Sequence, residues 1–139
     1  MDTKFSVAVH VLILVAESSE PMNSEQMAES VGTNASYIRK ILSLLKKSGI
    51  VNGHRGKSDC FLAVSPDNLT LLQIYRAVTD EGKIHLLDIH QNANDKCIVG
   101  RHIKPVLTDM FANVEENFAI SLKSKTLADC IAEIRNKLQ

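Results

Sequence analysis

Two short helical segments separated by a glycine turn constrain this chain more than any other feature. Residues 24–31 read SEQMAESV, and Gly32 ends this helix, because glycine readily adopts the left-handed conformation that follows a helix. A second helix then runs to about Lys47. Candidate N-terminal caps stand before each segment: Asn23 or Ser24 before the first, and Thr33 or Asn34 before the second. These dimensions predict a helix-turn-helix.

The second of these helices is amphipathic and carries positive charge on its polar side. Its apolar residues recur at the spacing of one helical stripe: Ile38, Ile41, Leu42 and Leu45. Cationic and hydroxyl side chains gather on the opposite side, with Tyr37 at the boundary: Ser36, Arg39, Lys40, Ser43 and Lys47. A solvated surface helix is the alternative interpretation. Such a face usually mixes Glu with Lys, however, so the lack of acids favours a polyanionic partner.

Positive charge is concentrated in one stretch of a chain whose formal net charge is zero. Residues 34–57 contain six Lys or Arg and no Asp or Glu. Residues 1–32 carry a net charge of −4 and residues 58–139 carry −2, so the neutral total hides a segregation of sign. This segregation indicates a nucleic-acid surface more directly than the total charge does.

A β-hairpin is predicted directly after the basic helix. The runs GIVNG and CFLAVS are prone to form strands, and the polar loop HRGKSD separates them. A two-stranded hairpin after a helix-turn-helix is a wing. Its tip carries His54, Arg55 and Lys57, which would extend the positive surface toward the DNA backbone or minor groove.

The first part of the chain completes a mainly α winged domain with a small β-hairpin. Residues 4–17 form a nearly apolar helix that suits a buried core. Thr70 caps a further helix over residues 71–78. We therefore assign residues 1–80 to a winged helix-turn-helix DNA-binding domain.

Residues 81–139 are assigned to a dimerisation region that contains a long helix and a terminal helix capped by Thr126. Pro105 is expected near the start of the long helix, where proline is tolerated. A long amphipathic helix beyond a complete domain has little core left to cover. We therefore predict that residues 99–123 pair two subunits; packing back onto the same chain is the alternative.

Membrane and enzyme classes find no support in the sequence. The apolar run FSVAVHVLILVA is shorter than the roughly 20 residues of a membrane span, and it has neither the leader nor the cleavage site of a signal peptide. We expect a cytoplasmic protein with no membrane partner. No Ser/His/Asp or Cys/His arrangement, P-loop or HExxH motif occurs, so we expect no enzyme activity and no cofactor.

The order and spacing of these segments resemble the IscR/CymR-like winged-helix regulators of the bacterial Rrf-type repressor family. The resemblance runs over nearly the whole chain. It is carried by ASYI in the helix-turn-helix, RGKSDCFLAVSPDNLTLLQIYRAV in the wing and next helix, CIVGRHIKPVL in the long helix and TLADCI in the terminal segment. The resemblance implies a sequence-specific transcription regulator, expected to repress, that binds a palindromic double-stranded DNA operator as a homodimer.

Two departures from the family pattern affect the expected chemistry. The family wing reads Arg-Gly-Pro-Gly-Gly-Gly-Tyr, whereas RGKSDCF here keeps Arg55 and Gly56 and adds Lys57. Family members that sense through an iron–sulfur cluster carry three cysteines before the long helix, where this chain has only Cys97. One thiolate cannot hold a cluster that needs three or four protein ligands, so we expect no cluster.

Eight residues of the helix start and the wing tip are candidate DNA contacts: Thr33, Asn34, Ser36, Tyr37, Arg39, Lys40, Arg55 and Lys57. Arg39 and Lys40 are expected at base edges or phosphates, because the N-terminal half of a recognition helix enters the groove. The neighbouring Ser36 and Tyr37 hydroxyls are expected at phosphates, and the wing cations at the backbone or minor groove. The two residues before the helix would offer backbone N–H groups to a phosphate.

Cys97 is the candidate redox sensor. It follows Lys96 and precedes Arg101 and His102 at a helix start, which are features that lower a thiol pKa and favour oxidation. A disulfide with Cys97 or Cys130 of the other subunit would reorient the recognition helices. A purely structural cysteine is the alternative.

Three further interpretations stay open. His85, His90 and His102 near Cys97 allow a metal site, but their spacing is irregular and we predict none. A small-molecule effector between the wing domain and the long helix is compatible with the sequence. A winged-helix protein-interaction module would require apolar groups on the exposed face of the basic helix.

Overall fold

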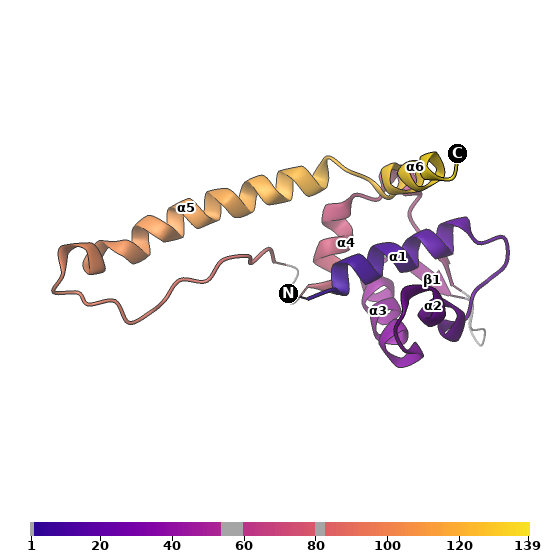
Figure 1. The fold of residues 1–139 in the computed structure, drawn as a ribbon, viewed down its shortest axis with the longest axis horizontal. Coiled ribbons are helices and arrows are strands. Elements are labelled where there is room, and N and C mark those ends of the chain that lie inside the picture. Colours follow the sequence, from indigo (N-terminus) through magenta and orange to yellow (C-terminus); the bar gives the residue numbers. More distant parts are fainter. Residues whose placement is uncertain (1, 54–59, 80–82) are drawn as a thin grey trace.

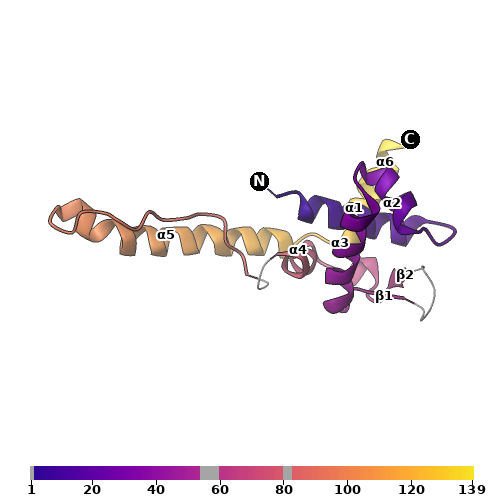
Figure 2. The ribbon, with the colours of Figure 1, turned by 90° about the horizontal axis from the view of Figure 1, so that it is seen from below.

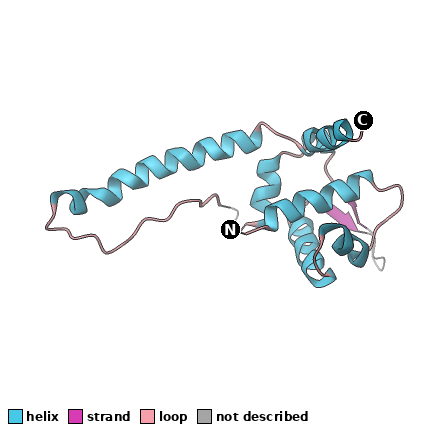
Figure 3. Cartoon of the chain, in the orientation of Figure 1, coloured by secondary structure: helices cyan, strands magenta, loops and turns pink. Residues whose placement is uncertain are grey.

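The computed structural model describes residues 2–53, 60–79 and 83–139, and its fold is mainly α with one small β-hairpin, as predicted (Figures 1 and 3). In chain order the elements are α1 (Lys4–Glu17), α2 (Ser24–Val31), α3 (Ala35–Lys47), β1 (Val51–Gly53), β2 (Cys60–Leu62), the 3₁₀ helix η1 (Pro66–Asn68), α4 (Leu71–Val78), α5 (Ile98–Lys123) and α6 (Leu127–Lys137). Among the described helices, none combines the length and the hydropathy that a membrane span requires.

Local capping interactions fix the boundaries of the helix-turn-helix. The Asn23 side chain accepts from the backbone N–H of Gln26, whose side chain accepts from the Asn23 N–H in return, so α2 begins in a capping box. Gly32 ends α2 with a φ of 87°, a left-handed conformation that costs glycine little. Asn34 then caps α3 through its side chain. The predicted stop and caps are therefore confirmed, with Asn23 and Asn34 as the capping residues.

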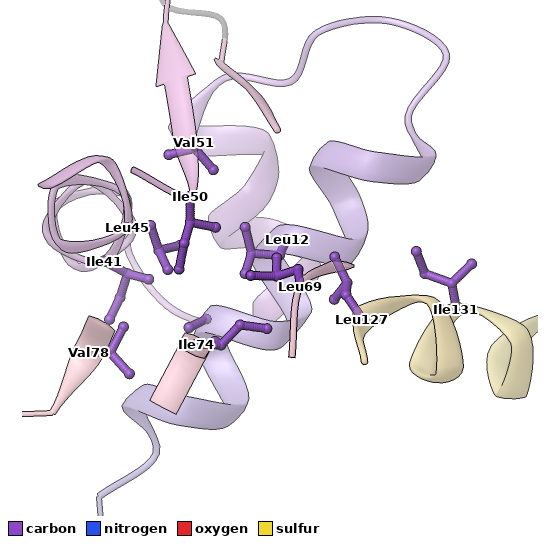
Figure 4. Packing of buried hydrophobic residues seen from close by; sticks show 11 residues of the cluster. Leu12, Ile41, Leu45, Ile50, Val51, Leu69, Ile74, Val78, Leu127 and Ile131 are labelled. Carbon is purple, nitrogen blue, oxygen red and sulfur yellow. The ribbon is translucent and has the colours of Figure 1, made fainter. Parts of the chain in front are cut away.

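Two clusters of buried apolar residues pack around α1. Helix α1 contributes Ala8 and Leu12, α3 contributes Ile41 and Leu45, and α4 contributes Ile74 (Figure 4). A second cluster lies between α1, α2 and α3 and includes Val11, Met27, Ala28 and Ile38. The nearly apolar composition of α1 thus follows from its central place, where neighbouring helices cover several of its sides.

The hairpin follows α3 directly and pairs its two strands antiparallel, with Val51 opposite Leu62 and Gly53 opposite Cys60. Val51 is buried in the core, which fixes the hairpin against α3. The predicted wing tip, with His54, Arg55 and Lys57, lies outside the described residues.

We call α1–α4, the hairpin and α6 the winged unit, and α5 the arm. The arm extends from the winged unit, and residues 83–97 run beside it without regular secondary structure (Figures 1 and 2). The Leu86 N–H donates to the Glu115 carboxylate, and Lys104 Nζ donates to Gln91 Oε1 at 2.8 Å. At the base of the arm, Tyr75 of α4 contacts Phe5 of α1 and Phe118 of α5 edge-to-face, with ring centroids 5.4 and 5.5 Å away.

The expectation that Pro105 lies near the helix start is wrong, because it lies inside α5. Proline has no N–H, so it cannot donate to the carbonyl of Arg101 one turn earlier. Both residues are exposed, and water can satisfy that carbonyl. An exposed arm therefore tolerates a proline that a buried helix would not.

Helix α6 returns from the arm and packs on the winged unit. Its Leu127 and Ile131 join the core of α1 (Figure 4). The Leu127 N–H donates to the Leu69 carbonyl at 2.8 Å, and the Leu71 N–H donates to the Lys125 carbonyl at 2.9 Å. The sequence grouped this helix with the dimerisation region, whereas it shares its core with α1. The predicted boundary between residues 80 and 81 lies outside the described residues.

Candidate nucleic-acid interface

Helix α3 divides its side chains between the core and the surface as predicted. Ile38, Ile41 and Leu45 are fully buried. The opposite face is exposed and polar: Ser36, Arg39, Lys40, Ser43 and Lys47. Tyr37 is half-buried, which agrees with its expected place at the boundary. The helix thus has one side that anchors it and one side free to meet a ligand.

The turn before α3 uses part of its hydrogen-bonding capacity internally. Asn34 Oδ1 accepts from the Tyr37 N–H at 2.9 Å, which leaves the Asn34 side-chain NH₂ as its outward donor. The Thr33 N–H donates to the Ala28 carbonyl at 3.0 Å. The expectation that the Thr33 backbone N–H is available to a phosphate is therefore wrong, since the glycine turn that ends α2 already uses it. Only the Thr33 hydroxyl is left for that purpose.

Arg39 has an acidic partner that sequence reasoning missed. Its Nη1 lies 3.7 Å from Oε1 of Glu25, which stands in the first turn of α2. The charges along α3 itself include no acid. No spacing rule within one helix reveals Glu25, because the contact depends on how α2 packs on α3.

A hollow of about 400 Å³ lies beside the same turn, between the N-terminal part of α1 and the start of α3. Thr33 and Tyr37 line it together with the hydroxyl-bearing Thr3 and Ser6 of the α1 N-terminus. These two residues were not predicted. They bring additional hydrogen-bonding groups next to the predicted ones.

The predicted pairing helix leaves an apolar stripe uncovered. No residue of α5 is buried. Val99, Val106, Met110 and Val114 are 64%, 47%, 60% and 50% exposed. At the helical repeat these four residues fall on one side of the distal half of α5. Exposed apolar side chains gathered on one side of a helix are typical of an interaction surface.

Comparisons with known proteins agree with this geometry. The family model Rrf2, described as an iron-dependent transcriptional regulator, matches residues 1–133. The chain belongs to this family.

Individual relatives support the assignment to Rrf2. YwnA of Bacillus subtilis, named an HTH-type transcriptional regulator, is 36% identical over 93% of this chain and 95% of its own. The structure of a transcriptional regulator from Lactobacillus plantarum is 28% identical, with a TM-score of 0.78 over 97% of this chain and 91% of that one. CymR, the global cysteine regulator of B. subtilis, is 20% identical and shares the fold, with a TM-score of 0.68 over 95% of each chain. This Rrf2 protein is a DNA-binding transcriptional regulator and not an enzyme.

The residues of this Rrf2 chain do not fit the iron that the family description names. Cys97 is the only cysteine between residues 83 and 98. Throughout the described ranges, no three His, Cys, Asp or Glu side chains lie close enough together to hold a metal ion. His85 instead pairs with Asp88, and this hydrogen bond, together with the carboxylate charge, raises the pKa of His85. The described residues therefore form no site that fits iron or an iron–sulfur cluster.

Cys97 is an exposed residue at the N-terminal cap of α5. The nearby backbone N–H groups of Gly100 and Val99 lower the pKa of its thiol. The predicted direction holds, and of the two predicted causes it is the helix start, not the cations, that lowers the pKa. Arg101 Nε donates to the Asp95 carbonyl at 2.9 Å, and His102 Nδ1 lies 2.7 Å from the Ile98 carbonyl oxygen.

The turn that presents Cys97 is built around Gly100. A Cβ added there would lie 2.2 Å from the Asn94 carbonyl oxygen, so the turn can approach the helix only at a glycine. The Cys97 N–H donates to that same carbonyl at 3.2 Å. Cys130 is different, because it is half-buried in α6 and burial raises the pKa of its thiol. The two cysteines lie beyond opposite ends of α5, so one subunit does not bring them together.

A second hollow, of about 480 Å³, lies between α4 and the base of α5. Leu72 and Ile120 form part of its lining, and Arg76 and Lys123 add cationic groups. It is located where the small-molecule alternative expects an effector, between the winged unit and the long helix. Its volume is in the range of ligand sites.

Proposed function

We propose that this Rrf2 regulator represses transcription by binding a palindromic operator as a homodimer, with the N-terminal half of α3 in the major groove. The observation that carries the proposal is the exposed, cationic and hydroxyl-bearing face of α3 opposite its buried stripe. A protein-interaction module would instead present apolar groups on that face. Repression follows if the occupied operator overlaps a promoter and excludes the polymerase.

Each candidate residue has a distinct role in this complex. Arg39 and Lys40 contact base edges or phosphates, and Ser36 and Tyr37 contact phosphates. The Asn34 side-chain NH₂ donates to a phosphate, and the Thr33 hydroxyl does the same. Arg55 and Lys57, which lie outside the described residues, reach the backbone or minor groove from the wing.

The α5 stripe supplies the dimer contact. Val99, Val106, Met110 and Val114 would pack against the same residues of a second copy, which gives the self-complementary interface of a two-fold dimer. Such a dimer presents two α3 helices to two half-sites. A palindromic operator reflects that symmetry.

The direct test is selection of bound duplexes from a random pool, followed by titration of the recovered site by fluorescence anisotropy. We expect Arg39→Ala to weaken operator binding by about 1–3 kcal/mol, the range of a specific base contact. Lys104→Ala removes the same charge from the α5 arm and should change affinity little. Neutralisation of six phosphates would give a log–log salt slope of about −5. Binding without salt dependence, or equal losses in both variants, would contradict the proposal.

We also propose that operator binding responds to oxidation of Cys97. Its exposure and lowered pKa favour the thiolate that peroxide attacks. Two thiols and one hydrogen peroxide give one disulfide between subunits and two waters. Cys97 of the partner is the favoured second thiol, because Cys130 is half-buried and its pKa is raised. Peroxide should change operator affinity in the unmodified protein and in Cys130→Ser, but not in Cys97→Ser.

A small-molecule response is the second candidate, and the hollow between α4 and α5 supports it. That hollow lies between α4, in the unit that would contact DNA, and α5, the helix that would pair the subunits. A ligand there would have to bind one relative arrangement of the two units more tightly than another in order to change operator affinity.

A further inference from the structure

Arg39 differs from the other cations of α3 because an acid from α2 lies next to it. Its Nη1 is 3.7 Å from Glu25 Oε1, and the two side chains are 59% and 71% exposed. Within residues 2–53, 60–79 and 83–139, no ion pair is formed by Lys40, Lys46 or Lys47. The ion pair with Glu25 therefore distinguishes Arg39, the residue that we expect to read the operator, from these three lysines.

Glu25 has a local role in α2, because an acid in the first turn complements the helix dipole, but its ion pair with Arg39 adds little to stability. Exposed ion pairs contribute little to folding, because water and salt screen them and two long side chains must be held in place. The start of α2 is already fixed by the capping box of Asn23 and Gln26. An acid beside a surface that must approach phosphates is also unfavourable for binding in general. Its effect should therefore appear in the choice between DNA sequences.

We propose that Glu25 is a specificity-determining residue, which positions the Arg39 guanidinium and selects against non-operator DNA. This inference rests on the proposed function, because it needs α3 in the major groove. Glu25 itself touches no base in this scheme. It acts through Arg39.

Glu25 first affects the orientation of the Arg39 guanidinium. Arginine has a long side chain with many rotamers, and its planar guanidinium recognises guanine only when two N–H groups point at O6 and N7 together. The Glu25 carboxylate lies beside Nη1 at ion-pair distance, and Nε and Nη2 remain available to donate. A guanidinium already restricted by a carboxylate loses less freedom when it meets the correct base.

Glu25 also affects the charge that the protein presents to DNA phosphates. Non-operator binding depends almost entirely on neutralising phosphates. There the Glu25 carboxylate offsets the charge of Arg39 and repels the backbone, and no base contact compensates for this. In the operator complex the base contact of Arg39 makes up for the same repulsion. Glu25 therefore weakens non-operator complexes more than the operator complex.

The experiment compares Glu25→Gln with Glu29→Gln in the full chain. Both residues are exposed on α2 and one helical turn apart, so the two variants make the same charge change. Each is titrated by fluorescence anisotropy with the operator recovered from the random pool and with a shuffled duplex of equal length. We expect Glu25→Gln to tighten shuffled-duplex binding about two- to fivefold, the range of a surface ion pair, with a smaller gain or a loss on the operator.

Glu29→Gln should shift both affinities by the same factor and leave their ratio unchanged. When Arg39 is also replaced by Gln, Glu25→Gln should no longer change the ratio of operator to shuffled-duplex affinity, because Glu25 acts through Arg39. The proposal would be overturned if Glu25→Gln left the affinity ratio unchanged, or if Glu29→Gln changed that ratio equally. It would also be overturned if Glu25→Gln still changed the ratio without Arg39. A thermal melt of each variant separates these results from a folding defect. An unmodified protein that prefers no duplex would instead refute the proposed function itself.

Discussion

Helices α1 and α5 are both rich in apolar residues, yet they bury them very differently. In α1, Ala8, Val11 and Leu12 are completely buried between neighbouring helices. In α5, no residue is buried, and Val106, Met110 and Val114 stay about half-exposed or more. The winged unit therefore has a complete core in one chain. The arm has an apolar surface that the described residues of the same chain leave uncovered.

This difference suggests that the two regions have different stabilities in isolation. The core of α1, α3, α4 and α6 is closed by caps, by the Tyr75 ring contacts and by backbone hydrogen bonds to the α6 segment. The arm is held at its base, and the proposed dimer would add pairing along α5. Mutations in the first region should affect folding, and mutations in the second should affect assembly.

The largest effect is expected for a cavity in the winged core. Leu12→Ala removes most of a fully buried side chain, and such changes cost about 2–5 kcal/mol of unfolding free energy. Urea denaturation followed by circular dichroism measures this. Ile120→Ala on α5 is the matched control, because its side chain is 59% exposed, and it should change stability by less than about 0.5 kcal/mol. Equal costs in the two helices would remove the distinction between core and arm.

A charge on the α5 stripe should separate the subunits without unfolding them. Met110→Glu would place a carboxylate in the proposed interface, where an unpaired charge costs about 2 kcal/mol or more. The dimer dissociation constant should then rise at least about 30-fold. Sedimentation velocity over a concentration series measures the change. Ala112→Glu puts the same charge on the opposite, exposed face of α5 and should leave assembly unchanged.

A monomeric Met110→Glu variant that keeps its helical signal would sharpen the comparison, because it would show that the arm is dispensable for folding. If Met110→Glu and Ala112→Glu both stay dimeric, another surface pairs the subunits. Loss of helical signal in Met110→Glu alone would mean that the stripe belongs to the fold of one chain.

The two regions also hold thiols in opposite environments. Cys97 on the arm has a lowered pKa because backbone N–H groups of the first turn of α5 lie near its sulfur, whereas burial raises the pKa of Cys130 in the winged unit. At pH 7 iodoacetamide should therefore alkylate Cys97 several-fold faster than Cys130, since only the thiolate reacts. The ratio of the two alkylation rates should narrow as pH rises, because the thiol with the lowered pKa approaches full ionisation first, while Cys130 is still gaining thiolate. Mass spectrometry of peptides from a time course tests this; faster reaction at Cys130 would contradict it.

Features governed by neighbouring residues could be predicted from the sequence. The bounds of α1, α2 and α4, the Gly32 stop and the caps of α3 and α6 depend on residues within one helical turn, so their patterns predict them directly. The division of α3 into buried and exposed faces follows from its period alone.

Features that depend on contacts between distant segments could not be predicted. The Glu25–Arg39 pair needs the packing angle of α2 on α3. The use of the Thr33 N–H depends on the geometry of the turn, and the packing of α6 on α1 depends on where the arm returns the chain. For Cys97 the helix start already predicts the lowered pKa of the thiol; what could not be predicted is that the Arg101 and His102 side chains bond backbone carbonyls.

The smallest effect is expected at the contact that joins the end of α6 to α1. Arg135 donates from Nε and Nη2 to the two carboxylate oxygens of Glu17, each at 2.9 Å. Because the Arg135 and Glu17 side chains are 65% and 35% exposed, solvent screens this pair, so Arg135→Ala should cost about 0.5–1 kcal/mol of unfolding free energy, and added salt should reduce the cost. Lys137→Ala on the same helix is the control for a simple loss of charge.

The same variant tests why α6 belongs to the winged unit. If apolar packing of Leu127 and Ile131 holds α6, then Arg135→Ala leaves the helix docked, and its amide protons remain protected in hydrogen exchange. A double-mutant cycle with Glu17→Gln isolates the pair energy from the loss of side-chain packing. Release of α6 in Arg135→Ala would mean that charge holds the helix, and the terminal segment would then resemble the arm more than the core.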